Sequence, residues 1–279
     1  MRRLIKLPFL CKPTISNCPK IIRYTAFILF VSLFLGCSST GDTEDEPYKS
    51  WPAEKLYKEA KREIKDGDYA LAIDYLENLE ARFPFGKLAD QAQLETAYAY
   101  FKYQEYDSSI AACERFIKLH PSHPNVDYAY YLRGLAAFHK KDSPFDAIAE
   151  LNPAERDPGS TRNAFNYFAE LVKKFPKSKY VPDAIERMKF QRNTLANHEL
   201  LIAQYYMKRG AYVAAVNRAK YIVENYPRTP AIPDALKLLT DAYNQLKMKD
   251  LADDTKRVLE LNYPDYKKHT GTGTEAEEN

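Results

Sequence analysis

The side chains that could do chemistry in this chain are few and lie far apart. His120 and His123 stand in the turn HPSHP, where two imidazoles could begin a metal site, but a structural role is favoured because prolines break the turn. Cys113 lies among apolar positions and is predicted to be a small core residue. The carboxylate pairs Asp253–Asp254 and Glu277–Glu278 are expected on solvated surface, without the cleft that catalysis requires. We therefore predict no catalytic, metal-binding or cofactor-binding residue.

Motifs and charge exclude further classes of function. The sequence has no Walker A loop, dinucleotide fingerprint, HExxH or nucleophile motif, and only 9 glycines among 279 residues. Its 41 Lys and Arg against 38 Asp and Glu are too even to indicate nucleic-acid binding. A basic run at helical spacing is interpreted as a solvated helix face, with contact to a partner's carboxylates as the less favoured alternative; it comprises Lys55, Lys58, Lys61 and Arg62. The sequence predicts a binding protein, not an enzyme.

The N-terminus carries a residue for which covalent modification is predicted, Cys37. Residues 1–24 are basic, and the apolar run of residues 25–36 would span about 18 Å as a helix, less than the ~30 Å of a bilayer core. This pattern is typical of a secretory signal peptide, predicted over residues 1–36. The run ends in LFLGC, which resembles a bacterial lipobox. The resemblance implies cleavage before Cys37, a diacylglycerol on its sulfur and an acyl chain on its amine. The alternative is an uncleaved anchor that ends in an ordinary cysteine.

Lipidation would attach the chain to a membrane, because two or three acyl chains anchor a protein stably where one does not. Ser38 follows the cysteine in place of aspartate, and the sorting rule of Gram-negative lipoproteins then implies the outer membrane. Residues 1–36 hold six Lys and Arg and no acid, so their removal turns the formal charge from +3 to −3. The polar residues 37–51 are predicted to be a flexible tether and residues 265–279 a disordered tail.

Between tether and tail, residues 52–264 contain a repeat. Five ungapped segments each place a proline 17 positions after their first residue, at Pro84, Pro121, Pro176, Pro227 and Pro264. The fifth position after the start is always small, and the twelfth is always large and apolar. The small residues are Ala72, Ser109, Ala164, Ala215 and Ala252, and the large ones Leu79, Phe116, Leu171, Ile222 and Leu259. These offsets predict an amphipathic helix that the proline ends. A further helix is predicted after the proline, capped by Asp90, Asp127, Asp183 or Asp234.

The period and the small residue resemble the tetratricopeptide repeat (TPR), whose helix pairs stack because no pair buries its own apolar face. The predicted fold is all-α, a right-handed α-solenoid of five TPR-like helix pairs. Two of the repeats are longer than the others. The extra residues 142–159 contain three prolines and are predicted to form a projecting loop, whereas residues 182–208 are predicted to form one unusually long helix.

Several segments resemble one family more closely than they resemble the general repeat. They are RFPFG at 82–86, RFIKLHPSHPNVDY at 115–128, YLRGL at 131–135, RDP at 156–158 and RGAYVAAVNR at 209–218. These segments are similar to the BamD family, the TPR lipoprotein subunit of the outer-membrane β-barrel assembly machine, and the likeness runs from Cys37 to about Pro264. It implies a lipid-anchored scaffold on the periplasmic face of the outer membrane that promotes the assembly and insertion of β-barrel proteins.

The resemblance also implies partners. The C-terminal repeats would bind the periplasmic domains of the barrel-forming subunit BamA, and the N-terminal repeats would receive unfolded outer-membrane β-barrel proteins. Other Bam lipoproteins would be held as well. The arginine of the VNR segment, Arg218 here, would pair with an acidic residue of BamA, with an ordinary solvated arginine as the alternative. Two rival functions stay open: another periplasmic TPR lipoprotein that scaffolds cell-envelope synthesis or division, and an enzyme formed by the loop at residues 142–159.

Overall fold

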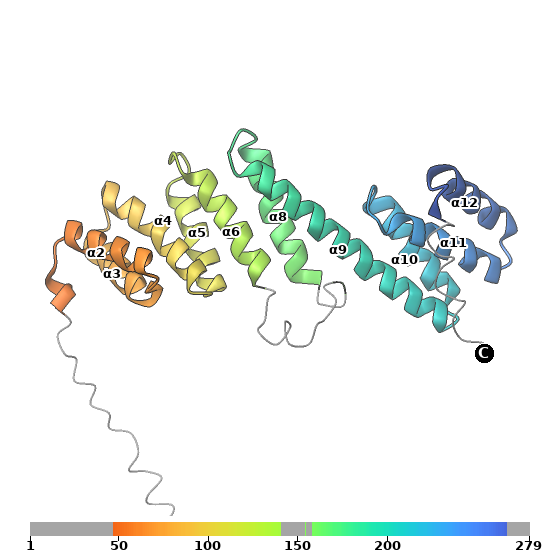
Figure 1. Ribbon diagram of the computed structural model, residues 1–279, viewed down its shortest axis with the longest axis horizontal. Helices are drawn as coiled ribbons and strands as arrows, with labels where there is room; N and C mark the ends of the chain where they lie inside the picture. The colour runs from red at the N-terminus through yellow and green to blue at the C-terminus, as the bar shows by residue number, and fades with distance from the viewer. Residues whose placement is uncertain (1–46, 141–153, 155–157, 267–279) are drawn as a thin grey trace, which may run out of the picture. The chain divides into compact units, whose positions relative to one another are not determined.

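The computed structural model describes residues 47–140, Ala154 and residues 158–266 (Figure 1). The predicted signal peptide, Cys37, most of the predicted tether, most of the predicted loop and the tail from residue 267 lie outside the described residues. The chain divides into two compact units, residues 1–49 and residues 50–279. All the α-helices that are described lie in the second unit.

The described residues form helices and no strands, which confirms the all-α prediction. The helices are α2 (Ala53–Asp66), α3 (Tyr69–Arg82), α4 (Lys87–Lys102), α5 (Tyr106–Leu119), α6 (Val126–His139), α8 (Pro158–Lys174), α9 (Val181–Lys208), α10 (Tyr212–Asn225), α11 (Ile232–Gln245) and α12 (Lys249–Asn262), with a short 3₁₀-helix η1 at Pro47–Ser50. Within the part of the chain that is described, none of these helices is both long and apolar enough to cross a bilayer.

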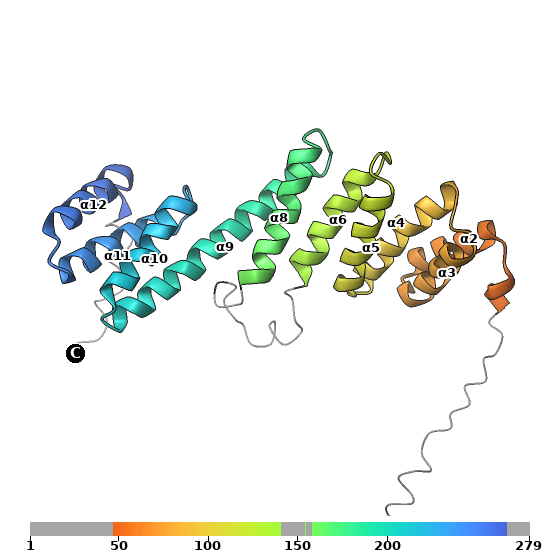
Figure 2. The same ribbon diagram turned by 180° about the vertical axis from the view of Figure 1, so that it is seen from behind.

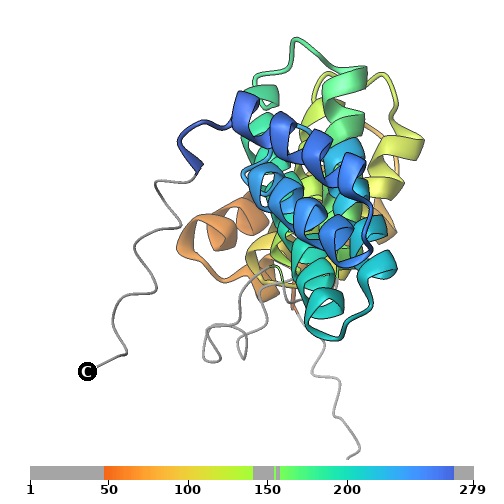
Figure 3. The ribbon, with the colours of Figure 1, turned by 90° about the vertical axis from the view of Figure 1, so that its right-hand side faces the viewer.

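Each helix of the second unit packs against the next one along the chain, as Figures 1 and 2 show. The five predicted pairs are therefore present as α2–α3, α4–α5, α6–α8, α9–α10 and α11–α12. First helices of neighbouring pairs also touch, namely α2 with α4, α4 with α6 and α9 with α11. Figure 3 views the same succession from the α12 end.

The repeated residue types explain this packing. The five small residues at the fifth position of each repeat are at most 1% exposed, and the five large residues at the twelfth are at most 7% exposed. A larger side chain at the fifth position would overpack the contact between paired helices. Ser109 fits there because its hydroxyl donates a hydrogen bond of 2.8 Å to the carbonyl of Ala97 on the preceding helix.

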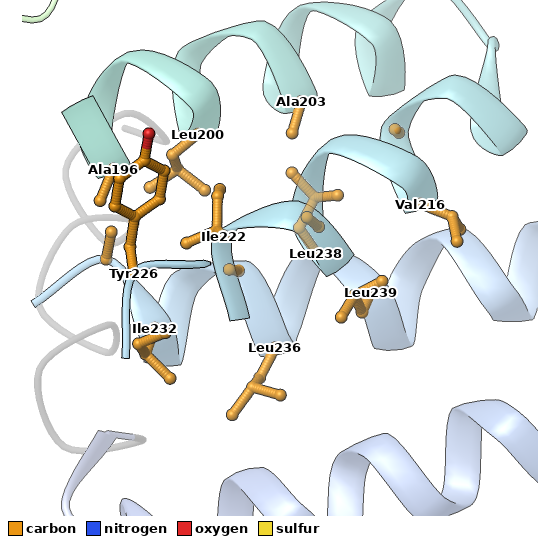
Figure 4. Close-up of a cluster of buried hydrophobic side chains, with 14 of the residues drawn as sticks. Ala196, Leu200, Ala203, Val216, Ile222, Tyr226, Ile232, Leu236, Leu238 and Leu239 are labelled. Carbon is orange, nitrogen blue, oxygen red and sulfur yellow. The ribbon is translucent and has the colours of Figure 1, made fainter. Parts of the chain in front are cut away.

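The predicted long helix is confirmed as α9, whose 28 residues span about 42 Å. Its first turns bury Val181 and Ala184 in a core shared with α4, α5, α6 and α8. Its last turns bury residues from Leu195 to Ala203 in a second core with α10, α11 and α12 (Figure 4). Gln191 lies between the two sets and is fully buried, and neither of its amide atoms has a hydrogen-bond partner among the described residues.

The predicted helix caps are wrong. Asp90, Asp127, Asp183 and Asp234 lie within the first turns of their helices, whereas the capping positions are held by Gly86, Asn125, Tyr180 and Ala231, whose side chains make no capping bond. In α9 and α11 a proline occupies the first turn, where its missing N–H costs nothing, so the helix starts before the aspartate. Three of the aspartates accept hydroxyl hydrogen bonds, from Ser178 to Asp127, Tyr131 to Asp183 and Tyr266 to Asp234. Asp127 also accepts a backbone hydrogen bond of 2.8 Å from the N–H of Tyr128, but from inside the first turn of α6 and not from its capping position.

Candidate partner-binding surface

Arg218 lies in the middle of α10, at its contact with α9. Its Nη1 donates a hydrogen bond of 2.9 Å to Oε2 of Glu199 on α9. The two side chains differ in exposure, with 44% for Arg218 and 9% for Glu199. The carboxylate is thus buried between the helices while the guanidinium reaches the surface.

This arrangement leaves the guanidinium able to bind a second carboxylate. Arginine has five N–H donors in a rigid fork, and the bond to Glu199 uses one of them. Glu199 fixes the direction of the fork, and fixing a donor before binding reduces the entropy lost on binding. A carboxylate of a partner protein that approaches Arg218 can therefore form a charge-assisted pair.

Glu199 was not singled out in the sequence, although a signal for it exists. It lies at helical spacing from Leu195 and Ala203, which are buried in the C-terminal core. An acidic residue on an otherwise apolar stripe needs a cation, because an unpaired buried charge is costly. What the sequence does not reveal is that this cation comes from position 218, since that depends on how α10 packs on α9.

The two histidines of the HPSHP turn are bound within the fold. His120 follows the last residue of α5, where its Nε2 lies 3.0 Å from Oε1 of Gln93 and its ring is tilted against that of Phe116 at a centroid distance of 5.0 Å. Nδ1 of His123 accepts a hydrogen bond of 3.1 Å from the N–H of Asn125. Across the described residues, no three His, Cys, Asp or Glu side chains come together as a metal site would need.

The other residues considered for chemistry are placed as follows. Cys113 is fully buried, and burial raises the pKa of its thiol to about 12. Asp253 and Asp254 are exposed on α12, and Asp254 pairs with Arg257. Glu277, Glu278 and Cys37, the predicted site of lipidation, lie outside the described residues.

Two pockets lie in the second half of the helix array. One of about 470 Å³ lies between α8, α9 and the turn before α11, with an apolar lining that includes Phe165 and Met188 and a rim that includes Arg192 and Arg228. The other, of about 560 Å³, lies between α11 and α12 and reaches Tyr266. Neither pocket is evident from the sequence, because each lining combines residues of at least two helices, and spacing along one helix does not show how two helices pack.

A buried arginine elsewhere in the array serves the fold. Arg133 on α6 pairs with Glu170 on α8 and lies 3.7 Å from Glu114 on α5. Its guanidinium also lies 4.2 Å from the ring centre of Tyr167. Because its charge is satisfied from two neighbouring helices and its side chain is 9% exposed, it joins α5, α6 and α8 and offers little to a partner.

Comparisons with known proteins match most of the chain. The family model described as YfiO, outer membrane lipoprotein, matches residues 49–259. The outer membrane protein assembly factor BamD of Neisseria gonorrhoeae is 46% identical over 242 residues, which cover 85% of this chain and 91% of that protein. The factor of the same name from Vibrio cholerae is 35% identical over 235 residues, 84% of this chain and 96% of that one. Among solved structures, the TPR2AB domain of yeast Sti1 in complex with an HSP90 peptide aligns with a TM-score of 0.39 at 13% identity, over 77% of this chain and 78% of that one.

Proposed function

This chain belongs to the BamD family of outer membrane protein assembly factors, and on that premise we propose that its C-terminal repeats dock BamA while its N-terminal repeats receive unfolded barrel proteins. As a member of this family it is an outer membrane lipoprotein of the BAM complex, and a scaffold instead of an enzyme. We assign two residues to this work, Cys37 as the lipid anchor and Arg218 as a contact to BamA, with the scaffold on the periplasmic face.

The assignment of Cys37 is supported by the sequence LFLGC, in which an apolar run ends at a small residue and a cysteine. Each buried CH₂ of an acyl chain contributes about 0.8 kcal/mol to membrane binding, so two or three chains hold the protein on the membrane. A tether also raises the effective concentration of the scaffold for partners on the same membrane, which increases avidity without new contacts.

Replacing the anchor tests its assignment. Cys37→Ser has no thiol to accept the diacylglycerol, so we expect the protein to disappear from the outer-membrane fraction after a urea wash, which removes proteins held only by contacts to BamA. Ser38→Thr, which keeps the cysteine and a hydroxyl beside it, serves as the matched control and should fractionate like the wild type. Undiminished recovery of Cys37→Ser with outer membranes would count against lipidation at this residue.

The observation that carries the docking proposal is the half-exposed guanidinium of Arg218 held by a buried carboxylate. Glu199 holds the guanidinium from α9 through one hydrogen bond, and 44% of the arginine side chain is exposed to solvent. A carboxylate on BamA would complete the pair. Glu199 already has its cation within the chain. A second carboxylate, from BamA, therefore adds affinity and orientation to the complex and is not needed for the stability of the fold.

The test of Arg218 needs a double variant, because Arg218→Gln alone would leave Glu199 buried without its cation. Arg218→Gln combined with Glu199→Gln removes both charges together. We expect this variant to keep a melting temperature near that of the wild type and to bind BamA roughly ten- to a hundredfold more weakly, as the loss of one charged hydrogen bond predicts. Arg62→Gln, which changes an exposed arginine on α2 in the N-terminal repeats, is the control. Equal BamA affinity of wild type and double variant would refute the contact.

The N-terminal repeats, α2 to α6, are the proposed receiver of unfolded barrel proteins, and other Bam lipoproteins are proposed to bind the same scaffold. This division of labour follows from the resemblance to the family and from no particular side chain. No nucleotide is available in the periplasm, so the free energy for assembly has to come from binding and from barrel folding itself.

A further inference from the structure

Phe85 lies exposed in a short turn between two helices. It lies between α3 and α4 and is 92% exposed, the highest value among the large apolar side chains of the described residues. Pro84 precedes it, and Gly86 follows with φ +108°, a conformation that favours glycine. Pro84 limits the turn to few conformations, and Gly86 allows the positive φ that directs the chain into α4. An exposed aromatic ring in such a turn indicates a binding surface.

Cations and a second aromatic ring gather at the same end of the α2–α3 pair. Nη1 of Arg82 donates a hydrogen bond of 2.8 Å to the carbonyl of Trp51. The Trp51 ring lies 5.6 Å from that of Tyr75, and the ammonium of Lys55 lies 3.8 Å from the centre of the Trp51 ring. We call Trp51, Lys55, Arg82, Phe85 and Lys87 the Phe85 cluster.

The Phe85 cluster is positively charged. Lys55, Arg82 and Lys87 are exposed, and none of them forms an ion pair with a carboxylate in the described structure. Glu54 is next to Lys55 in the sequence. The acids one helical turn from these cations are Glu59, which pairs with Arg62, and Asp90, which faces His120. Three cations with no carboxylate partner of their own leave a positive balance. An exposed ring that lies at the same end of the helix pair as these cations suits a binding surface that combines an apolar layer with anionic groups.

The cluster lies where the chain leads to its anchor. Fourteen peptide units join Cys37 to Trp51, and they span at most about 50 Å in any conformation. The chain is an outer membrane lipoprotein, so the membrane is always within reach of this end of the folded unit. Permanent proximity lets even a weak surface contact form.

We propose that the Phe85 cluster binds the anionic phospholipid surface of the leaflet that holds the lipid anchor, and so orients the scaffold on the membrane. Phe85 would enter the interface between headgroups and acyl chains, where aromatic residues concentrate, while Lys55, Arg82 and Lys87 attract anionic headgroups. The inference rests on the proposed anchor at Cys37. A protein partner with an acidic, apolar surface is the alternative occupant.

Trp51 makes the test possible without a label, because it is the sole tryptophan of the chain. The lipidated full chain is reconstituted in vesicles of phosphatidylcholine, with and without phosphatidylglycerol, that carry bromine on the upper part of the acyl chains. We expect strong quenching of Trp51 fluorescence in the anionic vesicles and weaker quenching in the neutral ones. Phe85→Ser should lose most of the quenching while the protein still floats with the vesicles, and Lys87→Glu should lose the difference between the two compositions.

Matched controls come from the end of α5, the corresponding place in the next repeat. Leu119→Ser removes another exposed apolar side chain, which is 57% exposed, and Lys118→Glu reverses another exposed charge. In both variants, Trp51 fluorescence should be quenched as strongly as in the wild type. A vesicle-bound wild type without quenching, or equal quenching of Phe85→Ser, would overturn the inference and favour a protein partner. A wild type that fails to float with vesicles would overturn the Cys37 anchor, and the inference with it.

Discussion

Glu199 keeps a charged carboxylate in a buried position because Arg218 reaches it from the next helix. Arg133 likewise pairs with carboxylates on other helices, which are α5 and α8. The two arginines stand out in the sequence because they lie in the segments RGAYVAAVNR and YLRGL, but their carboxylate partners do not stand out. Helical spacing shows which face of its own helix a residue occupies, whereas the partner depends on the packing of two helices, which spacing along one helix does not contain.

Cys113 gives a prediction at the residue scale. Its thiol is buried and its pKa is raised to about 12, so very little of the reactive thiolate forms at neutral pH. Removal of residues 1–36 would eliminate Cys11 and Cys18, and lipidation would block Cys37. We expect the mature protein to show no thiol toward Ellman's reagent when folded and one thiol in denaturant. A second thiol in denaturant would indicate an unmodified Cys37, and rapid reaction of the folded protein would contradict the burial of Cys113.

At the scale of elements, the repeat predicted the paired helices correctly but not the residues at which the helices begin. Small residues at one position and large ones seven positions later are enough to predict paired helices, because both patterns are local. The caps at Asp90, Asp183 and Asp234 were wrong because a glycine with positive φ or a proline in the first turn started the helices earlier. At α6 the capping position is held by Asn125, two residues before Asp127. The buried Gln191 could not be foreseen either, since it lies where one core ends along α9 and the next begins.

The contact between α6 and α8 gives a prediction at this scale. A Cβ atom at Gly134 would lie 2.6 Å from two ring carbons of Phe168, which is fully buried and has no room to move. In an open helix, Gly→Ala gains up to about 1 kcal/mol. We expect Gly134→Ala instead to lower the free energy of unfolding by about 1–3 kcal/mol, as overpacking does. Denaturant unfolding measures this.

A second substitution identifies the cause of that loss. Phe168→Leu removes ring atoms that the new methyl group would meet, so Gly134→Ala should cost less stability in the Phe168→Leu background than in the wild type. Equal costs in the two backgrounds would assign the effect to something other than the contact with Phe168, and a stabilising Gly134→Ala would contradict the close approach of α6 and α8.

At the scale of the whole molecule, the sequence assigned the family and the structure added the place of Arg218. The match to the BamD family covers residues 49–259, so every helix pair lies wholly or very largely within it. The segments that carry the resemblance include residues with a visible structural reason, such as Arg133 and Gly134 at the α5–α6–α8 contacts. Residues that bind a partner protein cannot be recognised in this way, because their contacts form with the partner and not within the chain.

The most direct test of BamA docking through the C-terminal repeats is photo-crosslinking at two matched positions in the assembled complex. Tyr221, 40% exposed on α10 near Arg218, and Tyr103, 52% exposed after α4, are each replaced by a photoreactive amino acid. The lipidated full chain is expressed and irradiated in cells that contain the whole BAM complex. We expect a crosslink to BamA from position 221 and none from position 103. A BamA crosslink from position 103 with none from position 221 would contradict the assignment of docking to the C-terminal repeats.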